Sequence, residues 1–351
     1  MIRHQSWRLP RWLRTTPFIL LILLCAACAP RLQPPGDAEV APRLLAGDAG
    51  WQAGDGRELP LRRWGPSSPK AVVLALHGFN DYSNAFAEAA EWWSGQGIAT
   101  YAPDQRGFGM APHRGLWPGQ DRLADDLAEL SGLLRQRHPG VPFYWLGESM
   151  GGAVVLHALE RVAARPDGAI LVAPAVWGRE SMPLLYRVAL WTTSYTIPWK
   201  TFTGQGLKVQ ASDNIEMLRR LSRDPLFIKA TRVDAIHGLV NLMDEAAAAR
   251  PERLPVLLMY GLKDEIIPKP PVERFVERFR SRPDIDMRIL VYRNGWHMLL
   301  RDLQAETVWR DTAAWIADPA AALPSGEERR VLPLFRPEEG ALVDGQAGDG
   351  K

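Results

Sequence analysis

Gly147-Glu-Ser-Met-Gly151 decides the fold, because this stretch joins an apolar run to a helical pattern. The run at 141–146 is typical of a buried strand, and residues 153–160 repeat apolar positions at helical spacing. A G-x-S-x-G sequence between a strand and a helix is a sharp turn that presents its serine hydroxyl to solvent. A glycine-rich turn with a merely solvated serine is the alternative, which the flanking strand and helix disfavour. We therefore expect Ser149 to attack an acyl carbon.

The chain has six apolar runs of this kind, including the one at 141–146. Helical stretches separate most of the runs, which lie at 71–76, 98–101, 141–146, 169–172, 256–260 and 287–292. Near-continuous apolar strands that alternate with helices predict an α/β fold with a mostly parallel central sheet flanked by helices. An earlier segment at 57–64 follows a Gly-Asp-Gly turn and is expected to add an antiparallel strand at one edge.

The strand pattern divides the chain into segments. Residues 51–176 and 251–318 carry the strands and form the two parts of the core, while 177–250 has scattered aromatic residues and short helical stretches but no buried-strand pattern. An insertion at that point predicts a helical cap over the carboxyl ends of the strands, where open α/β sheets bind ligands. Residues 28–50 and 319–351 lack sustained periodicity, so we expect a flexible tether and a mobile C-terminal tail.

Residues 1–27 have the features of a signal peptide, with arginines and no acid before an apolar core at 18–24. The stretch that ends at Cys28 resembles the lipobox of bacterial lipoproteins, which implies a lipidated N-terminal cysteine at that position. The resemblance implies a lipid-anchored protein of the bacterial cell envelope, at the outer membrane facing the periplasm, since Ala29 replaces the aspartate associated with inner-membrane retention. An ordinary secretory signal and an uncleaved anchor are the alternatives.

Composition sets limits on the remaining possibilities. The chain carries a net charge of +2, with 46% hydrophobic and 23% charged residues, which is ordinary for a globular protein. We see no basic stripe with interleaved aromatic residues, so a nucleic-acid partner is not expected. The two cysteines are Cys25 and Cys28, so the mature chain keeps at most one and no intrachain disulfide is expected.

A serine nucleophile needs a base to take its proton and an acid to orient that base. Asp264 follows the fifth apolar run, with its neighbour Glu265 as the alternative acid, and His297 follows the last run. The order serine, acid, histidine, each on a loop after a strand, is that of a hydrolase triad. We therefore predict Ser149, Asp264 and His297 as the catalytic residues, with no metal or cofactor required.

The tetrahedral intermediate of acyl transfer also needs backbone N–H donors that point at its oxyanion. One donor belongs to the residue after the nucleophile, which is Met150, and the other to the loop after the first parallel strand. In that loop we assign the second donor to Phe79. We expect the preceding His77 to brace the loop rather than to transfer protons.

Five motifs in the same order resemble the monoacylglycerol lipase and lysophospholipase branch of the α/β-hydrolase fold. The similarity covers about residues 50–317, and its motifs lie at 77–79, 101–109, 147–152, 261–264 and 295–297. The resemblance implies a serine esterase that hydrolyses single-chain acyl lipids, such as monoacylglycerols or lysophospholipids, with the cap shaping an acyl pocket.

Other functions of the same fold stay open at this point. A peptidase or amidase would need acids in the cap to hold a free amine, and the candidates are Glu216, Asp234, Asp244 and Glu245. An esterase of short-chain substrates would use the same triad. A non-catalytic envelope lipoprotein that serves as a scaffold is disfavoured by the complete set of serine, acid and histidine.

Overall fold

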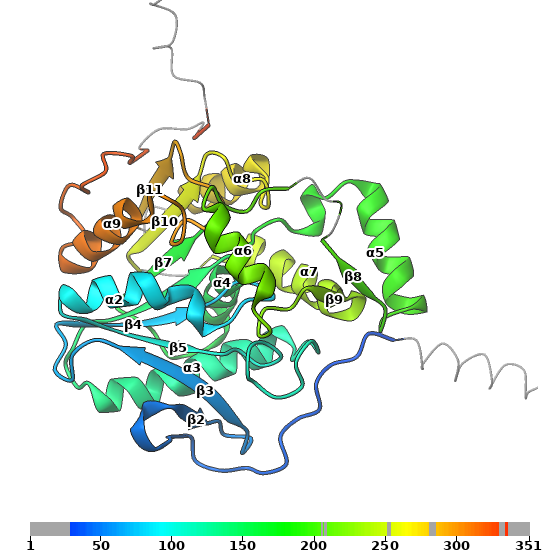
Figure 1. Cartoon of the computed structure of the whole chain (residues 1–351), viewed down its shortest axis with the longest axis horizontal. Helices are drawn as coiled ribbons and strands as arrows, with labels where there is room; N and C mark the ends of the chain where they lie inside the picture. The colour runs from blue at the N-terminus through cyan, green and yellow to red at the C-terminus, as the bar shows by residue number, and fades with distance from the viewer. Residues whose placement is uncertain are drawn as a thin grey trace, which may run out of the picture.

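The computed structural model describes residues 29–204, 206, 209–250, 254–280, 286–329 and 334–335 (Figure 1). The predicted signal peptide at 1–27 and the predicted lipidation site Cys28 lie outside the described residues, as does most of the predicted tail. No helix in the described part of the chain combines the length and the apolar character needed to cross a membrane.

A nine-stranded sheet runs through the domain in the order β1-β2-β3-β5-β4-β6-β7-β10-β11. Its strands are β1 (Arg43–Leu44), β2 (Gly50–Gln52), β3 (Glu58–Trp64), β4 (Ala71–Leu76), β5 (Ile98–Pro103), β6 (Phe143–Glu148), β7 (Gly168–Val172), β10 (Val256–Gly261) and β11 (Met287–Tyr292). The six strands from β5 to β11 are parallel, and β3 pairs antiparallel with β5. The predicted fold class is therefore confirmed, although β2 and β1 extend the sheet beyond the strand predicted at its edge.

Helices cover both faces of this sheet. They are α2 (Ala87–Gly95), α3 (Gln120–Arg137), α4 (Met150–Arg161), α7 (Val233–Ala248), α8 (Lys269–Arg280) and α9 (Ala305–Ala317), with short 3₁₀ helices η1 (Ala46–Asp48), η2 (Ser83–Phe86) and η3 (Arg179–Ser181). The buried side chains of α3, α4, α7 and α8 join one hydrophobic cluster, and those of α2 and α9 join another. Helices α3, α4, α7 and α8 therefore pack on one face of the sheet, and α2 and α9 pack on the opposite face (Figure 1).

The apolar runs of the parallel strands are explained by this two-sided packing. Successive side chains of a strand point to opposite faces. In β4, Val72 and Leu74 belong to the cluster under α3 and α4, while Val73 and Ala75 belong to the cluster under α2 and α9. Since both faces are covered by helices, every position of the strand is buried and apolar.

The cap is smaller than predicted and is not purely helical. It contains η3, α5 (Leu184–Thr196), β8 (Thr201–Thr203), α6 (Ile215–Arg223) and β9 (Ala230–Arg232), with β8 and β9 paired antiparallel. The predicted cap extended to residue 250, but α7 packs against α4 and α3 and contributes to the main core. The boundary is corrected to about residue 232, because the apolar stripe of α7 is buried by the core helices.

The prediction of a flexible tether at 28–50 is wrong for the described residues 29–50. Gln33 is buried and donates its side-chain amide to the carbonyl of Leu116 at 2.7 Å, and Val40 donates its backbone N–H to Gly54 at 2.9 Å. The segment then adds β1 and the start of β2 to the sheet. These partners are distant in sequence, so a stretch without periodicity can still be fixed by its backbone hydrogen bonds.

The predicted tail is likewise wrong for residues 319–329. Arg329 donates its backbone N–H to the carbonyl of Ile289, and Leu290 forms an isolated bridge with Glu328. The side chain of Glu328 also pairs with Arg288 at 2.9 Å. This segment therefore runs beside β11 and covers its edge.

Candidate active site

Ser149 occupies the turn between β6 and α4 with backbone angles of φ 53° and ψ −114°. A positive φ is strained for a residue with a side chain and is typical of functional sites. The two glycines of the motif are required by close packing. A Cβ on Gly147 would lie 2.3 Å from the carbonyl oxygen of Gly151, and a Cβ on Gly151 would lie 2.0 Å from that of Leu76. The turn therefore forms only with glycine at both positions.

Asp264 and His297 come together at the carboxyl ends of β10 and β11. Asp264 Oδ2 lies 2.8 Å from His297 Nδ1, and both residues are buried. The other oxygen, Asp264 Oδ1, accepts the backbone N–H groups of Ile266 at 2.7 Å and Ile267 at 2.9 Å. The carboxylate is thus fixed in orientation, and it places the imidazole proton on Nδ1, which leaves Nε2 as the basic nitrogen.

The alternative acid has a different role. Glu265 accepts the backbone N–H of Gln210, in the cap, at 2.7 Å. It therefore helps to hold the cap, and Asp264 is the residue of the two that contacts His297.

The pKa of His297 is raised above its ordinary value. Burial alone lowers this pKa, but the negative charge and hydrogen bond of Asp264 raise it, and the charge of Glu148 raises it further. Arg301 has a smaller, lowering effect. The balance makes the imidazole a stronger base than an isolated histidine, as proton abstraction from a serine hydroxyl requires.

Ser149 and His297 line the same cavity, whose volume is about 630 Å³. The structure thereby brings together the three residues that were predicted as a triad, with Asp264 behind the histidine. Most other walls are apolar and come from the cap and α7, and they include Trp177, Met182, Tyr186, Leu190, Phe227, Ile228, Ile236, Leu239, Val240 and Met243. A site of this size and character suits a largely hydrophobic ligand.

The two residues predicted to supply oxyanion donors lie beside Ser149. Met150 is the first residue of α4, where backbone N–H groups have no acceptor within the helix. Phe79 lies in the loop after β4 and lines the cavity, and a Cβ built on the neighbouring Gly78 would be 3.4 Å from Ser149 Cβ. The loop is therefore in close contact with the serine.

His77 has a structural role, in agreement with the interpretation from sequence. It is fully buried, and its Nε2 accepts the backbone N–H of Gln105 at 3.0 Å. Nδ1 therefore carries the proton and donates to the carbonyl of Gly78 at 2.8 Å. Burial lowers the pKa of His77, so the neutral ring joins two loops without exchanging protons.

The cap is fastened to the loops that carry the site. Ile228 donates its backbone N–H to the carbonyl of Asn80, in the oxyanion loop, at 2.9 Å. Ser212 donates its hydroxyl to Asp302, in the histidine loop, at 2.6 Å. The shape of the apolar cavity and the position of the catalytic loops are consequently coupled.

Asp121, His157 and Glu245 form a group with ligand atoms close enough to hold a metal ion. The imidazole of His157 lies 2.9 Å from Asp121 and 2.8 Å from Glu245, where α3, α4 and α7 meet. None of these three residues lines the cavity of Ser149. The three side chains contact one another at the surface, away from Ser149.

Sequence reasoning missed a second charged group at the site. Asp81, Glu148 and Arg301 are buried and line the cavity with Ser149, and Arg301 lies within ion-pair distance of both acids. The only signal in the sequence was the acid at 148, between an apolar strand and the nucleophile.

The fold and this arrangement of serine, histidine and aspartate define an α/β-hydrolase. Comparison with known families identifies the family within this fold, because residues 67–304 match the family described as serine aminopeptidase, S33. Since the match spans more than half of the chain, the protein belongs to that family.

Individual relatives carry lipase names. The chain is 27% identical over 262 residues to a monoacylglycerol lipase of Mycolicibacterium smegmatis, covering 72% of this chain and 90% of the relative. It is 28% identical over 280 residues to the monoglyceride lipase of Mus musculus, covering 78% and 91%. A solved structure of a monoglyceride lipase variant from Saccharomyces cerevisiae superposes with a TM-score of 0.64 at 19% identity, covering 83% of this chain and all of that one. The two sequence relatives support a lipid ester hydrolase, and the solved structure supports the fold.

Proposed function

We propose that the protein is a serine hydrolase that cleaves carboxylic esters of single-chain acyl lipids, monoacylglycerols or lysophospholipids, through an acyl-enzyme on Ser149. The observation that carries this proposal is the placing of a strained serine and an aspartate-paired histidine in one large apolar cavity. The lipase names of the relatives agree with it.

The proposed reaction has two halves. His297 Nε2 takes the proton of the Ser149 hydroxyl as the serine oxygen attacks the ester carbonyl. The backbone N–H groups of Phe79 and Met150 stabilise the resulting oxyanion. The intermediate then collapses, the alcohol leaves with the proton from His297, and the acyl group remains on the serine. In the second half His297 deprotonates a water molecule, which attacks the acyl-enzyme and releases the fatty acid and the free serine.

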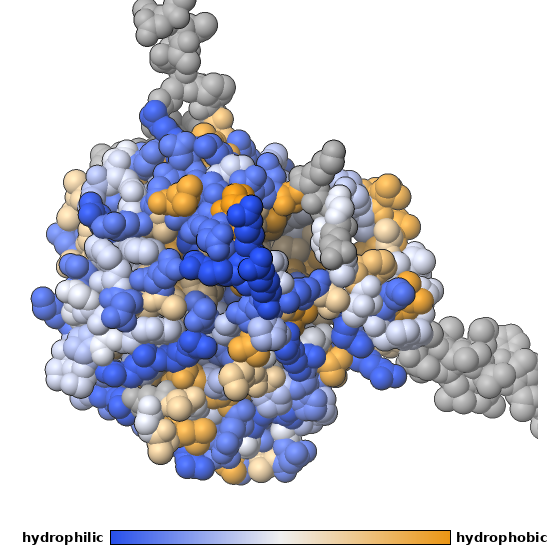
Figure 2. Space-filling view, viewed as in Figure 1, coloured by the Kyte–Doolittle hydropathy of each residue, from blue (hydrophilic) through white to orange (hydrophobic). Residues whose placement is uncertain are grey.

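The surface of the cap supports a lipid substrate. Figure 2 shows hydrophobic side chains gathered over α5, at the right of the view. Leu185 is 74% exposed and Trp191 is 65% exposed, and further exposed apolar residues of this face are Leu184, Tyr186, Val188 and Tyr195. An apolar surface of this kind, next to an apolar cavity, is typical of a protein that works at a lipid interface.

We further propose that Cys28 is lipidated and holds the protein at the outer membrane, facing the periplasm. The support is the lipobox-like sequence and the path of the chain that follows it. Arg31 donates its backbone N–H to Asp234, at the start of α7 and next to β9. An anchor at residue 28 would therefore keep the base of the cap near the lipid. Mass spectrometry of the mature N-terminus tests this proposal, and an unmodified terminus away from Cys28 would contradict it.

A peptidase or amidase is the second candidate, since the matched family is described as a serine aminopeptidase. The acids considered for binding a free amine are all engaged elsewhere. Asp234 pairs with Arg232, Asp244 with Arg179, Glu245 with His157 and the exposed Glu216 with Arg219. None of the four acids lines the cavity, which favours the ester hydrolase.

The experiment is hydrolysis of a substrate panel by the purified protein, with Ser149→Ala as the control. The panel holds short-chain and long-chain esters, a monoacylglycerol, a lysophospholipid and an aminoacyl amide. The proposal predicts serine-dependent turnover that is highest for the long single-chain lipids. Preference for the amide, or for short soluble esters alone, would contradict the proposed substrate class. A folded protein without any turnover would favour the non-catalytic scaffold.

A further inference from the structure

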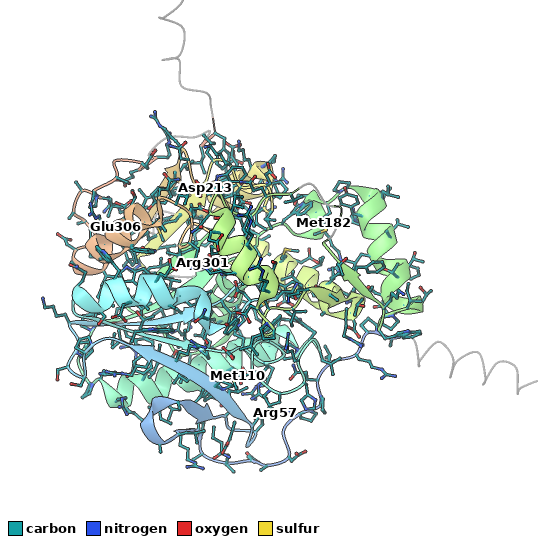
Figure 3. All side chains as sticks on the ribbon, viewed as in Figure 1. Arg57, Met110, Met182, Asp213, Arg301 and Glu306 are labelled. Carbon is teal, nitrogen blue, oxygen red and sulfur yellow. The ribbon has the colours of Figure 1, made fainter. Side chains whose placement is uncertain are left out.

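Arg301, which is labelled in Figure 3, lines the catalytic cavity and contacts two buried acids. Its Nη2 is 2.7 Å from Asp81 Oδ2 and 3.2 Å from Glu148 Oε2. The side chain of Arg301 is 10% exposed, and the two acids are 3% and 2% exposed. The three charges therefore act on one another with little screening by water.

The three members of the cluster come from three different segments beside the site, since Glu148 ends β6 while Asp81 and Arg301 lie outside the helices and strands. Asp81 is two residues after the oxyanion donor Phe79, and Glu148 directly precedes the nucleophile. Arg301 is four residues after His297. One guanidinium group thus joins the segments that carry the oxyanion donor, the nucleophile and the base.

Stability alone does not account for such a cluster. Buried ion pairs lose their hydration. A protein in which apolar residues of similar volume replace such a pair is often at least as stable. Within the described residues, Glu148 Oε1 and Arg301 Nε have no hydrogen-bond partner, which adds to the cost of burial. A costly charged group in contact with the site points to a role in catalysis.

We propose that Arg301 is a positioning residue that holds the oxyanion loop, through Asp81, and the nucleophile turn, through Glu148, at a fixed distance from each other. The N–H of Phe79 must meet the oxyanion that forms on the substrate, and small displacements of such donors are costly for the rate. This inference rests on the proposed serine hydrolase function.

His297 lines the same cavity as Glu148 and Arg301, so the cluster also acts electrostatically on the base. The charged groups that shift the pKa of His297 are Asp264 and Glu148, which raise it, and Arg301, which lowers it. Loss of the Glu148 charge alone should therefore lower the pKa of His297 and move the acid limb of activity to lower pH.

The test measures kcat and KM on the best ester for three variants of the full-length protein. Arg301→Met leaves two buried acids without their partner and is expected to fold poorly. The triple variant Asp81→Asn/Glu148→Gln/Arg301→Met removes all three charges, so that it can fold. We expect the triple variant to lose about 10- to 100-fold in kcat with KM little changed. Arg301→Lys keeps a cation in reach of both acids, so its kcat should stay much closer to that of the wild-type protein than the kcat of the triple variant.

The matched control is Arg288→Met/Glu328→Gln. It removes another ion pair of low exposure, at the end of β11 that is farther from His297. It should lower the melting temperature without changing kcat. A folded triple variant with wild-type kcat, or a lysine variant no better than the triple, would overturn the positioning role. An acid limb that does not move in Glu148→Gln would overturn the effect on the base. Failure of the proposed function is distinct, because the wild-type protein itself would then not hydrolyse the ester.

Discussion

Asp264 Oδ2 lies 2.8 Å from His297 Nδ1, at the ends of the neighbouring strands β10 and β11. The contact fixes the tautomer of the histidine and stabilises the imidazolium that forms when the serine proton is taken. Asp264→Asn preserves the shape of the side chain but presents an amide to the ring. We expect kcat to fall by a factor on the order of 10⁴ while the melting temperature changes little, as measured by steady-state kinetics and calorimetry. An active Asp264→Asn variant would mean that another group orients the base.

The pH dependence of the wild-type protein follows from the same contact. Only neutral His297 accepts the serine proton, and the charge and hydrogen bond of Asp264 raise the pKa of this residue above its ordinary value of 6.5. The histidine therefore stays protonated to higher pH, and activity is lost as pH falls through the raised pKa. A profile of kcat/KM against pH should show its acid limb above pH 6.5. A limb well below that value would show that the Asp264 interaction does not dominate in solution.

The nucleophile turn should not accept a methyl group. In Gly151→Ala the new Cβ would meet the backbone of Leu76 at 2.0 Å, so the turn must move. We expect a loss of about 1–3 kcal/mol in the free energy of unfolding, together with loss of activity. Gly132→Ala is the control, because that helical position has nothing within 4 Å and alanine should stabilise by roughly 0.5–1 kcal/mol. Urea unfolding and ester hydrolysis measure both effects, and an active, stable Gly151→Ala variant would be incompatible with this geometry.

The exposed apolar face of α5 should affect activity only on lipid that is aggregated in vesicles. Replacing Leu185 and Trp191 by serine removes apolar area that would otherwise contact the lipid surface. We expect activity on long-chain lipid in vesicles to fall about tenfold or more, with a soluble short-chain ester unaffected. Met110→Ser is the control, since this side chain is 68% exposed and lies away from α5 (Figure 3). Equal losses on both substrates would indicate damage to the fold rather than to an interface.

The sequence predicts a common location for the three triad residues, because each one follows a buried strand. Ser149, Asp264 and His297 each lie directly beyond an apolar run, and parallel strands bring such positions to one edge of the sheet. Their convergence in space is therefore a consequence of topology. The choice of Asp264 over Glu265 rested on spacing, and the contact with His297 agrees with that choice.

Features that depend on long-range partners could not be predicted. Arg301 and its acids are far apart in the sequence, and a single charged residue carries no sign of its partner. The hydrogen bond between Gln33 and Leu116 joins residues 83 positions apart. No local pattern shows such a partner, so the sequence before residue 50 predicts a tether. The helix at 233–248 looked like part of the cap, because its apolar stripe does not say which surface will bury it.

Covalent trapping of Ser149 is the sharpest test of the proposed serine hydrolase. The folded wild-type protein is incubated with a fluorophosphonate probe, digested, and analysed by mass spectrometry, with Ser149→Ala as the parallel sample. We expect the probe mass on the peptide that contains Ser149 and its absence from the variant. Hydrolysis of lipid esters by a protein that never labels at Ser149, or that labels at another residue instead, would contradict it.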